Sequence, residues 1–181
     1  MEIDETIISD IKNGAVGVMP TDTIFGLVAS VKFPESIQRI YDVKNRPTDR
    51  RCIVLIGNRG QMPALGINPT PKQLEVLNEF WPGPFSLDLK CDDTLPYIHN
   101  AKFSIAVRMP AETWLRQMIN QTGPIVATSA NISGEATPSN IEEIKVKLPG
   151  LDFYIDGSVS TEPSKLGKLD ENGDIFWLRG V

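Results

Sequence analysis

Several catalytic groups are scarce in this chain of 181 residues. It has one histidine, His99, and two cysteines, Cys52 and Cys91, with no CxxC spacing. So few nitrogen and sulfur ligands argue against a zinc cluster. A lone histidine in an expected surface turn argues against a Ser-His or Cys-His hydrolase, and no GxSxG motif is present. We therefore expect neither a metal held by protein ligands nor a protein nucleophile.

Excess positive charge and long apolar runs are also lacking. The formal net charge is −5, so no global basic field attracts nucleic acid, and any RNA contact needs a local patch. No apolar run approaches the roughly 20 residues that cross a bilayer. The acidic start of the chain, residues 1–5, differs from the basic start of a secretion signal. We expect a cytoplasmic protein without a membrane anchor, with both thiols reduced.

What is present is ordinary for one globular domain over residues 1–181, with 41% hydrophobic and 23% charged residues. Apolar spacing predicts helices over residues 3–11, 34–44, 71–81, 111–121 and 141–148. Short apolar or alternating segments predict strands over residues 15–19, 52–56, 85–90, 103–107, 125–128, 153–155 and 175–178. Because some strand pairs have no helix between them, we expect an α+β fold with a mixed sheet and helices packed on its faces.

Two polar clusters follow the first predicted strand and the second predicted helix. Thr21, Asp22 and Thr23 end the strand, where hydroxyls can bind a small polar ligand or simply form a turn. Lys44 and Arg46 stand two residues apart at the helix exit. In an extended segment both would point the same way and could clamp a polyphosphate. The competing interpretation is a solvated last turn that favours the helix dipole.

Two further clusters end later strands. Ser129 and Asn131 open a loop of small polar residues that continues to Ser139, and such a loop lets a backbone approach phosphates. The loop lacks the Walker pattern and could equally be plain hydrophilic chain. Arg108 ends an apolar strand, where it needs either a ligand anion or a structural ion pair. Positioning and charge neutralisation by such residues suit phosphoryl or nucleotidyl transfer.

The order of these clusters is more specific than any one of them. Together they resemble the YrdC/Sua5 family, over about residues 14–164 and in its short form. The matching segments are PTDTIFGL at 20–27, KNRP at 44–47, WPGP at 81–84, VRMP at 107–110 and TSANISG at 128–134.

The resemblance implies a YrdC/RibB-like fold, a twisted mixed sheet around a deep central groove. It also implies an L-threonylcarbamoyladenylate synthase, a nucleotidyltransferase that uses ATP, L-threonine and bicarbonate, usually with Mg²⁺, and releases pyrophosphate. The product serves N6-threonylcarbamoyladenosine formation in tRNA, through downstream threonylcarbamoyl-transfer proteins. A carbamate attacking an anionic α-phosphate needs neutralising cations, which is the role implied for Lys44, Arg46 and Mg²⁺.

By the same resemblance, two sets of positions receive roles. Lys44 and Arg46 would be catalytic. The nucleotide-binding set would be Lys44, Arg46, Arg50, Ser104, Ser129, Asn131, Ser139 and Arg179. The threonine-binding set would be Thr23, Arg108, Ser129 and Ser164.

This sequence departs from the family's pattern at three places. Arg51-Cys52 stands where many relatives carry Pro-Leu, Leu55 stands where some carry a threonine-contacting histidine, and residues 165–170 differ from the usual sequence after Ser164. The departures leave open a paralogue that acts on a different acceptor. Two interpretations without catalysis also stay open. One is an RNA-binding module, using a rim that includes Arg50 and Arg51, and the second is a nucleotide-binding regulator without turnover.

Overall fold

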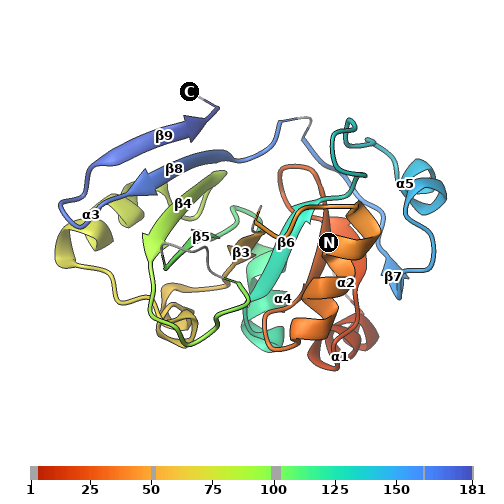
Figure 1. The fold of residues 1–181 in the computed structure, drawn as a ribbon, viewed down its shortest axis with the longest axis horizontal. Helices are drawn as coiled ribbons and strands as arrows, with labels where there is room; N and C mark the ends of the chain where they lie inside the picture. Colours follow the sequence, from red (N-terminus) through yellow and green to blue (C-terminus); the bar gives the residue numbers. More distant parts are fainter. Residues whose placement is uncertain (1–3, 50–51, 99–102, 161, 181) are drawn as a thin grey trace.

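A computed structural model describes residues 4–49, 52–98, 103–160 and 162–180. Their strands form one mixed sheet in the order β7-β1-β2-β6-β3-β5-β4-β8-β9, which twists across the molecule (Figure 1). The strands are Gly17–Pro20 (β1), Phe25–Ser30 (β2), Ile53–Leu55 (β3), Phe85–Lys90 (β4), Ser104–Arg108 (β5), Ile125–Ser129 (β6), Phe153–Tyr154 (β7), Lys165–Leu169 (β8) and Ile175–Arg179 (β9).

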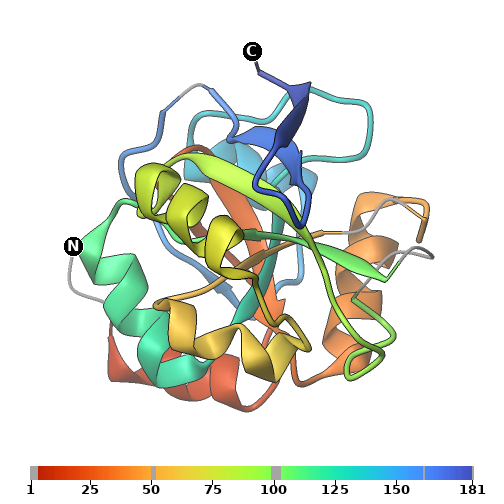
Figure 2. The same cartoon turned by 90° about the vertical axis from the view of Figure 1, so that its left-hand side faces the viewer.

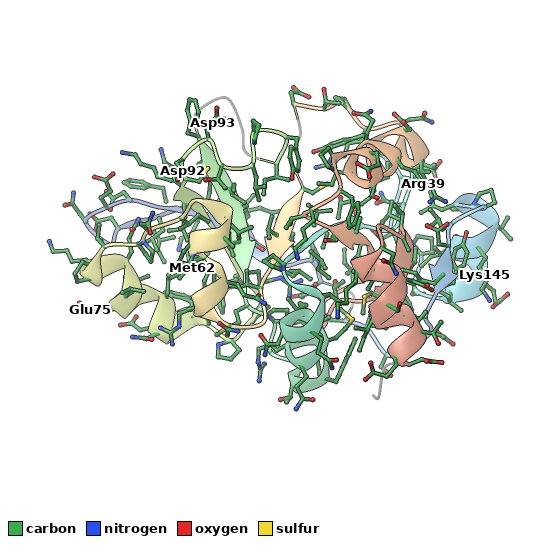
Figure 3. The ribbon with its side chains drawn as sticks, turned by 90° about the horizontal axis from the view of Figure 1, so that it is seen from below. Arg39, Met62, Glu75, Asp92, Asp93 and Lys145 are labelled. Atoms are coloured by element: carbon green, nitrogen blue, oxygen red, sulfur yellow. The ribbon has the colours of Figure 1, made fainter. Side chains whose placement is uncertain are left out.

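Five α-helices pack around this sheet in the described part of the chain. They are Glu5–Lys12 (α1), Pro34–Lys44 (α2), Pro71–Phe80 (α3), Thr113–Thr122 (α4) and Ile141–Lys147 (α5). Figure 2 shows α1 and α4 lying together, and Figure 3 shows Glu75 of α3 and Lys145 of α5 at opposite ends of the molecule. None of the described helices is long and apolar enough to cross a membrane.

The core lies in two clusters, one associated with α1 and α4 and the other with α2, α3 and α5. Ile11 and Leu115 belong to the first cluster, and Ile40, Leu77 and Ile144 to the second. Both clusters include residues of β2, which is buried along its whole length. The sheet mixes antiparallel pairs, such as β2 with β6, and parallel pairs, such as β3 with β5. The predicted α+β mixed sheet is confirmed.

Local sequence signals explain where helices begin and end. Thr70 and Gln73 form a capping box at the start of α3, with Pro71 in the first turn. The α2 helix also begins with a proline, and it ends at Asn45, whose φ of 49° is left-handed. Asn45 turns the backbone sharply between Lys44 and Arg46.

Two strands were not predicted. Residues 25–30 form β2, whose two buried faces remove the alternation that marks a strand. Residues 165–169 form β8, which contains a glycine and two lysines and is held by pairing with β4 and β9. Ile3, Arg50, Arg51 and His99 lie outside the described residues. Cys52 and Cys91 are not joined in a disulfide.

Candidate active site

A cavity of about 590 Å³ lies where the segment after β1, the end of α2, the loop after β6 and the β8–β9 hairpin meet. Most of the residues that we singled out from the sequence line it. They are Thr23, Arg46, Arg108, Ser129, Asn131, Ser139, Ser164 and Arg179. Residues far apart in the sequence therefore share one pocket, as the resemblance implied.

Lys44 does not line the pocket and is fully buried against the loop after β6. Its Nζ donates to the carbonyl of Ser129, to the carbonyl of Asn131 at 2.6 Å, and to Asn131 Oδ1 at 3.0 Å. An ammonium has three donors, so these acceptors use all of them. Burial, together with the nearby Arg46 cation, lowers the pKa of Lys44 to about 8.

Asn131 completes the loop that Lys44 holds. Its Nδ2 donates to the carbonyls of Ile132 at 3.0 Å and Glu135 at 2.6 Å, and its Oδ1 accepts from Ser129 Oγ at 2.5 Å. The amide thus fixes the segment from residue 129 to residue 135 as a rigid rim of the pocket. The alternative of a plain hydrophilic loop does not describe this arrangement.

The expectation that Lys44 and Arg46 project side by side from an extended segment is wrong. Asn45 is left-handed, so the two side chains take different directions: Lys44 goes into the fold and Arg46 lines the pocket. The physical cause is the helix end, which sequence spacing alone does not reveal.

Arg46 shares the pocket with Arg179, which comes from β9. Arg179 Nη2 donates to the carbonyl of Ser164 at 2.9 Å. Burial lowers the pKa of Arg179, and the nearby charge of Arg46 adds to the effect. Two cations that repel each other in one cavity favour an anionic ligand, because its charge relieves the repulsion.

Arg108 forms a second cationic centre and is 1% exposed. Its Nη1 donates to Asp22 Oδ1, and its Nη2 donates to the carbonyl of Thr21 at 3.1 Å. Its Nε is buried and has no hydrogen-bond partner among the described residues. The structural ion pair that we considered from the sequence therefore exists, yet Nε of this pocket-lining arginine has no partner among the described residues.

Hydroxyl groups complete the pocket wall. Thr23 is buried, with Oγ1 at 3.5 Å from the Thr21 carbonyl, and Ser164 Oγ lies 2.9 Å from Ser86 Oγ. Ser139 is exposed and lines the cavity, but it does not head α5. The cap is Asn140, whose side chain accepts from Glu143 N at 2.8 Å.

The structure does not bring Ser104 to this pocket. Ser104 lies at the opposite end of β5 from Arg108, and its Oγ donates to Asp88 Oδ2 at 2.8 Å. Arg50 lies outside the described residues. Sequence reasoning gave no role to Asp22, although it belongs to the same polar cluster as Thr23. Its left-handed backbone, with φ of 63°, and its ion pair appear only in the fold.

A site with two cationic centres can hold a ligand that carries phosphates at one and a carboxylate at the other. Glu135 is the acidic residue among the described pocket-lining positions, and its side chain pairs with Lys147 at 3.2 Å. Among the described residues, no three His, Cys, Asp or Glu side chains group to hold a metal ion. The fold and the pocket thus define an α+β protein with a pocket whose cations suit a small anionic ligand.

Comparison with known proteins identifies the family. Residues 9–176 match the Sua5/YciO/YrdC family model, described as "Telomere recombination". The chain is 34% identical over 161 residues to a threonylcarbamoyl-AMP synthase of Bacillus subtilis, covering 87% of this chain and 45% of that protein. It is 30% identical over 152 residues to the synthase of Vibrio parahaemolyticus, covering 82% of each. The chain belongs to the Sua5/YciO/YrdC family, which confirms the resemblance.

Solved structures agree with this assignment. The crystal structure of P. abyssi Sua5 complexed with L-threonine superposes with a TM-score of 0.84 at 29% identity, covering 93% of this chain and 52% of that one. E. coli YciO, at 20% identity and a TM-score of 0.81, shares the fold. The chain spans less than half the length of the Bacillus and Pyrococcus relatives that it matches.

Proposed function

We propose that this chain is an ATP-dependent threonylcarbamoyl-AMP synthase and therefore a nucleotidyltransferase. It would form one YrdC-like catalytic domain over residues 1–181 and act in the cytoplasm. The observation that carries the proposal is the pairing, in one pocket, of the Arg46–Arg179 centre with Arg108, whose Nε is unused. Curated relatives of the family bear the name of this activity.

In the proposed reaction, the threonine amine and bicarbonate condense to a carbamate with loss of water. A carbamate oxygen then attacks the α-phosphorus of ATP, the bond to the β-phosphate oxygen breaks, and pyrophosphate leaves. Both reacting groups are anionic, so cations must be in place before they meet. Arg46 and Arg179 would neutralise the phosphates, while the rim formed by Ser129 and Asn131 would hold them.

The other residues take supporting roles in this proposal. Lys44 would act through the loop that it holds rather than by touching phosphate, since its three donors are used. Ser139 would contact the nucleotide, and Arg50 remains a proposed nucleotide contact. Threonine would place its carboxylate on Arg108, in the site completed by the positions that the sequence assigned to it, Thr23, Ser129 and Ser164.

Mg²⁺ would enter as part of the ATP complex. Mg²⁺ prefers oxygen ligands and keeps several waters when substrate phosphates hold it. The pocket carboxylate Glu135 already pairs with Lys147, so the phosphates are the better donors. The product would pass to downstream tRNA threonylcarbamoyl-transfer proteins, and any direct RNA contact would use a local basic patch.

The test is pyrophosphate release with each substrate omitted in turn. We expect release only when ATP, threonine and bicarbonate are all present. Release supported by another amino acid in place of threonine would indicate a paralogue with a different acceptor. Nucleotide binding without release under any condition would refute the enzyme and indicate a binding module.

A further inference from the structure

Asp22 is a buried carboxylate to which the proposed reaction assigns no role. Its side chain is 4% exposed, and its backbone adopts a left-handed φ of 63°. Its neighbours Thr21 and Thr23 line the pocket, whereas Asp22 points behind the wall to Arg108. A non-glycine residue held in this backbone region is often found at functional sites, where the surrounding structure maintains it.

Both carboxylate oxygens of Asp22 are engaged. Oδ1 accepts from Arg108 Nη1, and Oδ2 accepts from the backbone N–H of Ala111 at 2.9 Å. The carbonyl of Thr21 takes a third contact, from Arg108 Nη2. These bonds tie the segment after β1 to the end of β5 and to the chain that leads into α4. They fix the plane of the Arg108 guanidinium from one side, and Nε has no partner within the described part of the chain.

We infer that Asp22 is the positioning residue of the amino-acid subsite. It holds the Arg108 guanidinium so that Nε stays available to the carboxylate of the substrate, and it keeps Arg108 in register with Thr23. The inference rests on the proposed function for the identity of the amino acid. Asp22 affects anion binding at Arg108 in two opposite ways. Its negative charge weakens the attraction between Arg108 and an anion, but its hydrogen bond orients the guanidinium. Orientation dominates, because a planar fork binds a carboxylate well only when it is aligned.

The test is the variant Asp22→Asn, which keeps the size of the side chain and tolerates the left-handed backbone. An amide has one oxygen, so it cannot accept on both sides as the carboxylate does, and Arg108 loses its anchor. We expect the KM for threonine to rise about tenfold, the scale of one charge-assisted hydrogen bond. The KM for ATP and the kcat at saturating threonine should stay within about twofold.

Asp152→Asn is a control outside the pocket, at a side chain that is 39% exposed against 4% for Asp22 and that receives both of its bonds on one oxygen. Asp152 Oδ2 also accepts from one arginine, Arg39 Nη1 at 2.7 Å, and from one backbone N–H, that of Val16 at 2.7 Å. Asp152 does not line the pocket, and Arg39 lies on α2 (Figure 3). Neither KM should change in this variant. An equal rise of both KM values in Asp22→Asn would overturn the inference. A threonine KM that stays constant or falls would also overturn it, the latter by showing that Asp22 competes with the substrate.

If Asp22→Asn does not fold, a second measurement on the unaltered protein still tests the inference. The Arg108 side-chain N–H signals are followed by NMR during titration with threonine and with threoninol, which lacks the carboxylate. We expect the Nε signal to shift with threonine alone and Nη1 to stay in place. A shift of Nη1 without Nε would overturn the inference. If threonine moves Nε but supports no pyrophosphate release, the positioning role stands and the proposed reaction fails.

Discussion

Lys44 and Arg108 are both buried cations beside one pocket, and they differ in how many donors remain. Lys44 meets three acceptors of the loop after β6, which use its whole ammonium group. Arg108 donates to Asp22 and Thr21 with two of its five N–H groups, and its Nε has no partner among the described residues. Counting donors against acceptors therefore separates a residue that builds the site from one that can still receive a ligand. The comparison predicts that substitution of Lys44 lowers stability and turnover, whereas substitution of Arg108 mainly raises the KM for threonine.

Lys44→Met should have the largest effect. The loop loses three hydrogen bonds and keeps buried acceptors without partners, so we expect a loss of about 2–3 kcal/mol in the free energy of unfolding. Turnover should fall by about 10²-fold or more as the rim loosens. Urea denaturation and pyrophosphate release measure the two quantities. Lys145→Met, at an exposed lysine that pairs with Glu142, should change stability by under about 0.5 kcal/mol. Equal stability of the two variants would contradict the organising role of Lys44.

Arg46→Ala should separate turnover from stability. Arg46 is half-buried in the pocket wall, so we expect about a 10²-fold loss of turnover from missing charge. The free energy of unfolding should stay within about 0.5 kcal/mol of the original. Arg59→Ala removes another half-buried arginine, one outside the pocket, and should leave turnover intact. Pyrophosphate release by Arg46→Ala at close to the original rate would contradict the proposed role of Arg46.

Arg108→Lys tests the other member of the comparison. Lysine keeps the charge but loses the planar fork, so we expect the KM for threonine to rise about tenfold. The KM for ATP should change far less, because we propose that the phosphates bind at the Arg46–Arg179 centre. Steady-state kinetics with each substrate varied separately measures both. A parallel change of both KM values would mean that Arg108 serves the whole pocket rather than one ligand.

Raising the pH should have a smaller effect, which increases the stability of the fold and decreases the affinity for ATP. The pKa of Lys44 is about 8 in the fold and 10.5 ordinarily, so between these values the unfolded chain binds more protons. The contribution of Lys44 to stability therefore rises as pH increases from about 8 to 10.5. ATP affinity should fall about threefold over the same step, because the positive charge of Lys44 behind the loop after β6 is lost. Calorimetry from about pH 7 to about pH 9.5 tests this, and Lys44→Met should show no such step.

Ser104→Ala should have the smallest effect on catalysis. Ser104 bonds Asp88 and lies outside the pocket, so the KM for ATP should stay within about twofold. Stability should fall by about 1 kcal/mol, because the half-buried Asp88 loses a donor. A large rise in the KM for ATP would return Ser104 to the nucleotide site and would contradict its position here.

Much of the fold was predictable because it rests on local patterns. Pro34 and the apolar spacing after it predicted the bounds of α2, and the alternation in residues 85–90 predicted β4. Local patterns did not predict β2 and β8, because both depend on tertiary contacts. β2 is buried on both faces, and β8 is held by pairing with its neighbours. Much of the candidate site was predictable, since ordered motifs place Thr23, Arg46 and Arg108 at strand or helix ends, but Ser104 lies outside the pocket.

The sequence by itself determined which side chains are available and where the helices and most of the strands lie. Residue types and short-range spacing carry that information, because capping and burial patterns are local. Only the tertiary structure decided what each cation does. The turn at Asn45 sends Lys44 inward and leaves Arg46 in the pocket, and the β8–β9 hairpin brings Arg179 beside it. Arg108 and its partner Asp22 are separated by 86 residues in sequence, and no local pattern encodes such a contact.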